Sequence, residues 1–96
     1  MPLSALVVDK KDNVATALRQ LEKGDSIGVE VEGSVVTVVL RQLIPFGHKF
    51  SLKDIERGER IIKYGETIGQ ATERINKGEH VHIHNVEGLR GRGDKP

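Results

Sequence analysis

The sequence contains no cysteine, which excludes disulfide bonds, thiolate metal sites and a cysteine nucleophile. Aromatic residues make up only 3% of the chain, so neither a base-stacking platform nor an aromatic ligand cage is expected. The 15 basic and 14 acidic residues nearly balance, and the chain lacks the strong positive field that binds nucleic acids. We therefore expect no nucleic-acid partner.

Long apolar runs are also missing. A run such as residues 35–40 is far shorter than the roughly 20 residues that cross a bilayer, and no basic-then-apolar leader begins the chain. These absences predict a cytoplasmic protein without a membrane partner. The length of 96 residues is enough for one domain, which we predict over residues 1–88, with a flexible, glycine-rich tail at 89–96.

Aliphatic residues dominate what is present, and several stretches are typical of strands. Residues 3–8 form a short apolar run, and residues 26–31 and 35–40 flank Glu32-Gly33-Ser34, a sequence typical of a hairpin turn. After Pro45 the apolar segments are short and separated by glycines, which predicts a turn-rich β unit without a long helix.

One segment has the spacing of a helix. Val14, Ala17, Leu18 and Leu21 recur at i, i+3, i+4 and i+7 before Gly24, which predicts an amphipathic helix that ends at the glycine. The fold class predicted from these patterns is mainly β, with one or two short helices.

A weak repeat occurs at residues 21–25, 55–59 and 75–79. Each copy has an apolar residue three positions before a glycine and an acidic residue directly after it. We interpret each copy as a short helical turn that a glycine with positive φ closes before a strand. Chance similarity among common surface residues is the alternative.

The segment His80-Val81-His82-Ile83-His84-Asn85 alternates imidazole and aliphatic side chains. In an extended strand His80, His82 and His84 would project from one face, and imidazole is a common ligand for transition metals. The competing interpretation is a strand with one solvated polar face. Three histidines in register favour a function, and we predict that they bind a metal.

Two further segments carry reactive side chains. In Gly47-His48-Lys49 the glycine gives the backbone freedom beside a histidine, and Lys49 can offer a positive charge to a carboxylate. Tyr64 is the single tyrosine, and its hydroxyl can donate to a substrate or transfer a proton. Each segment alone is also consistent with ordinary surface residues.

Several motifs occur together in a specific order: Gly47-His48-Lys49-Phe50, then Ile62-Lys63-Tyr64-Gly65-Glu66, then Gly78-Glu79 and the histidine run up to Asn85. In this order and spacing the chain resembles the N-terminal domain of altronate dehydratases, and it is similar to the small alpha subunit of sulfolactate sulfo-lyases. The resemblance covers nearly the whole chain and implies a SAF domain with the β-clip fold.

The resemblance also implies a function and a site. The family chemistry is β-elimination from a small sugar acid, with a divalent metal, Fe²⁺ or Mn²⁺, and a large catalytic subunit as partner. It implies His48, Lys49, Tyr64 and His82 as catalytic candidates, and His80, His82 and His84 as metal ligands.

Because the sequence stops soon after the histidine run, we expect a small subunit of an altronate-dehydratase-type hydro-lyase that is inactive alone. The alternatives are the sulfolactate sulfo-lyase alpha subunit and a non-catalytic SAF module that serves binding or assembly, and homo-oligomerisation stays open.

Overall fold

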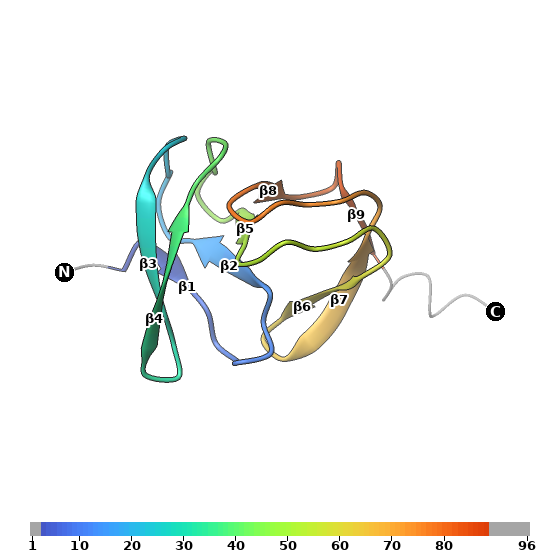
Figure 1. The fold of residues 1–96 in the computed structure, drawn as a ribbon, viewed down its shortest axis with the longest axis horizontal. Helices are drawn as coiled ribbons and strands as arrows, with labels where there is room; N and C mark the ends of the chain where they lie inside the picture. The colour runs from blue at the N-terminus through green and yellow to red at the C-terminus, as the bar shows by residue number, and fades with distance from the viewer. Residues whose placement is uncertain (1–2, 89–96) are drawn as a thin grey trace.

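A central sheet of four short antiparallel strands organises the molecule (Figure 1). The structure is a computed structural model that describes residues 3–88. The sheet has the order β1-β2-β5-β8, and its strands are β1 (Ala5–Leu6), β2 (Val14–Ala17), β5 (Lys49–Ser51) and β8 (His80–Val81). Strands distant in sequence therefore become neighbours at its centre.

A two-stranded hairpin forms one end of the molecule. Strands β3 (Ser26–Val31) and β4 (Ser34–Val39) pair from Ser26–Val39 to Val31–Ser34. Glu32 and Gly33 connect them with φ values of 48° and 81°, and two successive positive φ values give the type of turn that suits a tight hairpin. The predicted hairpin is confirmed, with a two-residue turn.

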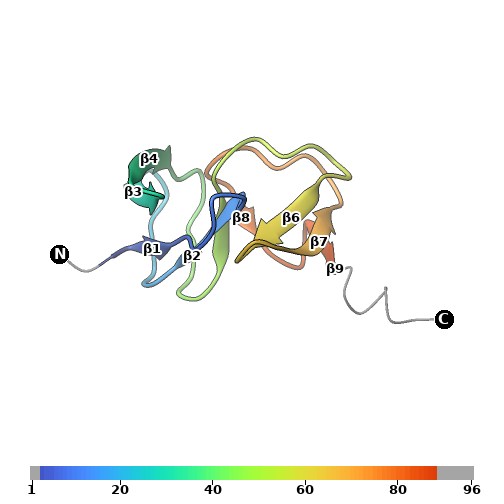
Figure 2. The same cartoon turned by 90° about the horizontal axis from the view of Figure 1, so that it is seen from below.

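A three-stranded sheet forms the other end. It consists of β6 (Arg60–Lys63), β7 (Glu66–Ala71) and β9 (Val86–Gly88), in the order β6-β7-β9. Figures 1 and 2 both place the central sheet between this unit and the β3–β4 hairpin. The prediction of a turn-rich β unit in the second half is confirmed.

The predicted helix is wrong, because residues 3–88 contain strands, turns and bridges but no helix. Val14–Ala17 form β2, and Leu21 makes an isolated bridge with Ile44. The helical spacing arose because β2 is buried on both faces: Val14 packs into one apolar cluster, whereas the next residue, Ala15, packs into another. A strand buried on both faces loses its two-residue alternation.

These two clusters form the core. The cluster toward the hairpin contains Leu21, Ile27, Val38 and Phe50, and the cluster toward β6 and β7 contains Val14, Ile55, Ile61, Ile75 and Val81 among its members. Strands β2, β5 and β8 contribute to these clusters from the central sheet. The central sheet therefore contributes side chains to both apolar clusters.

The repeat forms turns rather than helical turns. Gly24, Gly58 and Gly78 have φ values of 91°, 89° and 89°, which confirms the predicted positive φ. In each copy the acidic side chain after the glycine accepts a hydrogen bond from the backbone N–H three residues earlier. These three segments thus share one turn design.

The predicted tail at 89–96 lies outside the described residues. The part of the chain from 3 to 88 has no helix that is long and apolar enough to cross a membrane.

Candidate functional site

The pairing of β5 with β8 brings His48 to the histidine segment. Phe50 pairs with His80 and Lys49 pairs with Val81 in antiparallel register, so the residues just beyond these pairs, His48 and His82, also come close. The rings of His48 and His82 stack with centroids 4.1 Å apart. This proximity depends on strand pairing across the central sheet.

Three imidazoles form a compact group. The Nδ1 atom of His48 lies 2.8 Å from Nε2 of His80, and one ligand nitrogen from each of His48, His80 and His82 lies within 4.8 Å of the others. The three rings are nearly parallel, with interplanar angles of 11° to 19°. We call these three residues the histidine cluster.

Asn85 holds the two histidines of the C-terminal segment in place. Its side chain is buried, its Oδ1 accepts a hydrogen bond of 3.0 Å from the His82 N–H, and its Nδ2 donates to the His80 carbonyl at 2.9 Å. The N–H of His80 donates to Oε1 of Gln42 at 2.8 Å. The backbone that carries the cluster is therefore fixed by side chains on both sides.

The predicted strand through His84 is wrong beyond Val81. Strand β8 ends at Val81, and Asn85 closes the chain into a turn by bonding back to His82. As a result Ile83 is 85% exposed instead of sharing the buried face of Val81. The His84 ring is tilted against that of His80 at 5.2 Å, outside the group of three, so His84 as a metal ligand stays a prediction.

The surroundings of His80 and His82 favour the neutral form of these two imidazoles. Burial, followed by the neighbouring His48, His84 and His82 rings and then by Lys49, lowers the pKa of His80 from 6.5 to about 4. Burial, followed by His48, Lys49 and His84, also lowers the pKa of His82. Neutral imidazole is the form that donates a lone pair to a metal ion.

The turn before His48 explains why this position is free to hold a histidine. Residues 44–48 form a fourth turn of the repeat, in which Gly47 has φ 83° and the His48 N–H donates to the Pro45 carbonyl. In the other three turns an acid occupies the position of His48 and accepts a backbone N–H. In this turn Pro45 occupies the position of that N–H donor. Because proline has no N–H, no acidic side chain is needed at position 48 to accept a hydrogen bond.

Sequence patterns alone missed this fourth copy because the acid that defines the other three is absent. The apolar residue three positions before Gly47, Ile44, was the available signal. The bridging role of Asn85 was also missed, although asparagine is a recognisable turn former and follows the histidine run directly.

The other predicted catalytic residues have different environments. Lys49 is half-buried beside the cluster, and burial together with the charge of Lys63 lowers its pKa from 10.5. Tyr64 lies in the turn between β6 and β7 with φ 55°, and the Nζ atom of Lys63 is 4.8 Å above its ring. The structure thus brings Lys49 to the cluster and gives Tyr64 a lysine as its ring contact.

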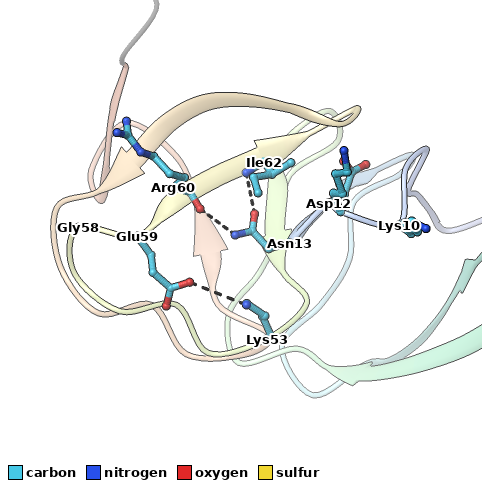
Figure 3. Close-up of a pocket in the computed structure, with 9 residues that line it drawn as sticks. Lys10, Asp12, Asn13, Lys53, Gly58, Glu59, Arg60 and Ile62 are labelled. Atoms are coloured by element: carbon cyan, nitrogen blue, oxygen red, sulfur yellow. Dashed lines mark hydrogen bonds and ion pairs between the residues drawn. The ribbon is translucent and has the colours of Figure 1, made fainter.

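A separate pocket of about 480 Å³ lies near the start of β2 and the start of β6. Figure 3 shows that some of its polar groups bind one another: Asn13 bonds to the backbone of Arg60 and Ile62, and Lys53 pairs with Glu59 at 3.8 Å. None of its lining residues is a histidine. We therefore regard the histidine cluster, and not this pocket, as the candidate site.

Comparison with characterised proteins gives similar sequences among lyases. Altronate dehydratase from Escherichia coli is 49% identical over 75 residues, covering 78% of this chain but 14% of that protein. Altronate dehydratase from Bacillus subtilis is 38% identical over 87 residues, covering 88% of this chain and 16% of that protein. The chain thus spans about a sixth or less of the length of these dehydratases.

A (2R)-sulfolactate sulfo-lyase subunit alpha from Chromohalobacter salexigens is 44% identical over 48 residues, covering 50% of this chain and 51% of that subunit. The family described as the altronate/galactarate dehydratase SAF domain matches residues 3–89. This match includes the strands of the central sheet and every residue of the histidine cluster. By its sequence and its β architecture, the chain belongs to the altronate/galactarate dehydratase SAF domain family.

Proposed function

We propose that this chain is the SAF component of an altronate-dehydratase-type lyase, and that its histidine cluster binds a divalent metal in a site completed by a larger catalytic part. The observation that supports this proposal is the group of three ligand nitrogens from His48, His80 and His82 within 4.8 Å of one another. The lyase names of the relatives support the reaction class.

The donor set fits a transition metal. Three imidazoles without a carboxylate suit iron better than manganese, because manganese prefers oxygen ligands. Two of the three rings have a pKa below the ordinary value of histidine, so protons compete weakly for these nitrogens near pH 7. Of the two ions that the family resemblance implies, we therefore favour Fe²⁺.

The reaction requires a base, a positive charge and an acid. A proton leaves the carbon beside the carboxylate, hydroxide leaves the next carbon, and the resulting enol becomes a 2-keto-3-deoxy acid. A bound metal supplies positive charge for the developing enediolate. His48, His80 and His82 would hold the metal, and Lys49 would add a positive charge beside the bound sugar acid.

Size and exposure support the proposal of a shared site. Ligand sites usually enclose most of a small molecule's surface, whereas Ile83 in the turn of the cluster is 85% exposed. The dehydratase relatives are more than six times longer than the matched segment. We infer that a larger catalytic part covers the cluster and completes the pocket.

A sulfo-lyase function is the alternative, and the similarity to the sulfolactate sulfo-lyase alpha subunits supports it. The same carbanion chemistry then expels sulfite in place of hydroxide. A SAF module that only supports assembly is the remaining alternative, and in that case the histidines would serve the interface between the chains.

The test is to purify the chain alone and together with its large lyase partner. We expect the chain alone to bind Fe²⁺ or Co²⁺ under anaerobic conditions and to lack dehydratase activity. The complex should form a 2-keto acid from altronate, and sulfite release from sulfolactate would instead favour the alternative. Dehydratase turnover by the isolated chain would contradict the proposal of a shared site.

A further inference from the structure

A small pocket lies directly beside the histidine cluster. It has a volume of about 220 Å³ and is bordered by side chains from β5, β7, β9 and the turn after β8. Its lining consists of Lys49, Ile68, His82, Ile83, Val86 and Gly88. It thus places one lysine and one cluster histidine against an aliphatic wall.

The charge in this pocket is unbalanced. Lys49 is its one lining cation, no carboxylate lines it, and the ion pairs between residues 3 and 88 involve Lys53 and Arg74 but not Lys49. Lys63 adds a second positive charge close to Lys49. A half-buried lysine that lies beside another cation, and that takes part in none of the ion pairs within residues 3–88, which are Lys53–Glu59, Arg74–Asp54 and Arg74–Glu56, favours an anionic ligand.

The position of Lys49 is set by the fold. Lys49 pairs with Val81 across β5 and β8, and Val81 is fully buried in the cluster toward β6 and β7. Partners directly opposite in a sheet lie on one face, so the aliphatic stem of Lys49 follows the buried face of Val81. The lysine is held at the pocket and is not a freely swinging surface side chain.

We propose that this pocket binds the carboxylate end of a small hydroxy acid, with Lys49 as the counter-charge and the aliphatic side chains of Ile68 and Val86 against the adjacent carbons. This inference rests on the proposed function and assigns one end of its substrate. Small-ligand sites commonly combine an apolar lining with a few polar groups that fix orientation. The carbon that loses its proton then lies on the side of His82.

The lining also indicates what the pocket does not recognise. Ile68, Ile83 and Val86 offer no side-chain hydrogen bonds, so only Lys49 and His82 among the lining side chains can bind polar groups, too few for a chain of hydroxyls. The hydroxyl-bearing remainder of the acid extends out of the pocket and contacts the catalytic part. This chain therefore selects for the carboxylate, and its partner selects among acids.

The test uses the isolated 96-residue chain labelled with ¹⁵N and two probes, sodium gluconate and sorbitol, at constant ionic strength. Both are six-carbon polyols, but only gluconate carries a carboxylate. We expect saturable amide shifts at Lys49, Ile68, Ile83 and Val86 with gluconate, and no such shifts with sorbitol. Absence of these shifts with gluconate, or equal shifts with both probes, would overturn the proposal.

Lysine variants separate the pocket from general surface charge. Lys49→Gln should weaken gluconate binding by about tenfold or more, because it removes the charged partner. Lys53→Gln is the matched control, since Lys53 is an exposed lysine paired with Glu59, and it should bind gluconate like the wild type. Equal binding by the Lys49→Gln and Lys53→Gln variants contradicts the proposal.

Metal binding by the same wild-type sample distinguishes the two proposals. If Co²⁺ binds at the histidine cluster but gluconate causes no pocket shifts, the carboxylate pocket is wrong and the proposed metal site stands. If gluconate binds at Lys49 but Co²⁺ causes no change at the histidines, the pocket stands and the metal-based function fails.

Discussion

The Nδ1 atom of His48 lies 2.8 Å from Nε2 of His80, although 32 residues separate them in sequence. Antiparallel pairing of Phe50 with His80 produces this contact, and the buried Phe50 side chain anchors the strand beneath it. The candidate metal site is thus a product of strand pairing between two short segments, each of which carries only part of the donor set.

The cluster geometry predicts which histidines bind metal. Alanine at His48, His80 or His82 should each reduce Co²⁺ affinity by more than about tenfold, because even the loss of a residue that only supports a ligand commonly costs 10- to 100-fold. His84→Ala tests the predicted fourth ligand, and it should bind Co²⁺ like the wild type if the three-histidine cluster is the whole donor set. Isothermal titration calorimetry measures the four affinities, and a His84→Ala loss as large as the others would contradict the three-histidine site.

Asn85 should matter for both stability and metal binding. Asn85→Ala removes the partners of the His82 N–H and the His80 carbonyl, and we expect a loss of about 1–3 kcal/mol in the free energy of unfolding. Because the turn that carries the cluster loosens, metal affinity should also fall by about 10- to 100-fold.

Urea denaturation and calorimetry provide the two measurements for Asn85→Ala. Asn76→Ala is the control, since the Asn76 side chain accepts a hydrogen bond from the exposed Arg74. Unchanged metal affinity in Asn85→Ala would show that the cluster does not depend on the hydrogen bonds of the Asn85 side chain.

Two glycines at equivalent turn positions should respond differently to alanine. Gly24 and Gly78 have φ values of 91° and 89°, but a Cβ at Gly24 would meet nothing within 4 Å, whereas a Cβ at Gly78 would lie 2.2 Å from the Val39 carbonyl oxygen. We expect Gly24→Ala to cost about 1–2 kcal/mol of stability and Gly78→Ala about 2–5 kcal/mol.

Chemical denaturation of the two glycine variants side by side isolates the packing effect, because both carry the same backbone strain. Equal losses for the two variants would mean that the contact between the Gly78 turn and β4 relaxes freely.

Asn13 should be essential for joining β2 to β6. Its buried side chain donates to the Arg60 carbonyl and accepts from the Ile62 N–H, both at 2.8 Å. Asn13→Ala leaves both backbone groups without these partners and should cost about 2–4 kcal/mol. Hydrogen exchange at the Ile62 amide should accelerate with it. Gln20→Ala, at an exposed side chain, is the control and should stay within about 0.5 kcal/mol of the wild type.

Local features of the sequence were sufficient for part of the fold. The β3–β4 hairpin was predictable because Glu32-Gly33 and the flanking aliphatic residues specify turn and strands without distant partners. The positive φ at Gly24, Gly58 and Gly78 was predictable for the same reason, since each turn is closed by bonds within five residues. The predictable elements are those whose partners are near in sequence.

Other elements depended on distant contacts. Val14 to Leu21 has helical spacing, yet it becomes strand and bridge because Ser51 and Ile44 pair with its two ends and two core clusters bury both faces of β2. The histidine run has strand spacing, yet it turns after Val81 because the Asn85 side chain bonds to His82. In both places, tertiary bonds outweigh the local pattern.

The sequence by itself determined the lyase family, the β-rich class and the histidines from which a site can be built. Only the tertiary structure decided that His48 joins His80 and His82 while His84 lies beside them, and that Lys49 faces an aliphatic pocket. The reason is physical: a side chain's neighbours across a sheet are set by register between strands distant in sequence, and register depends on the buried residues of both strands.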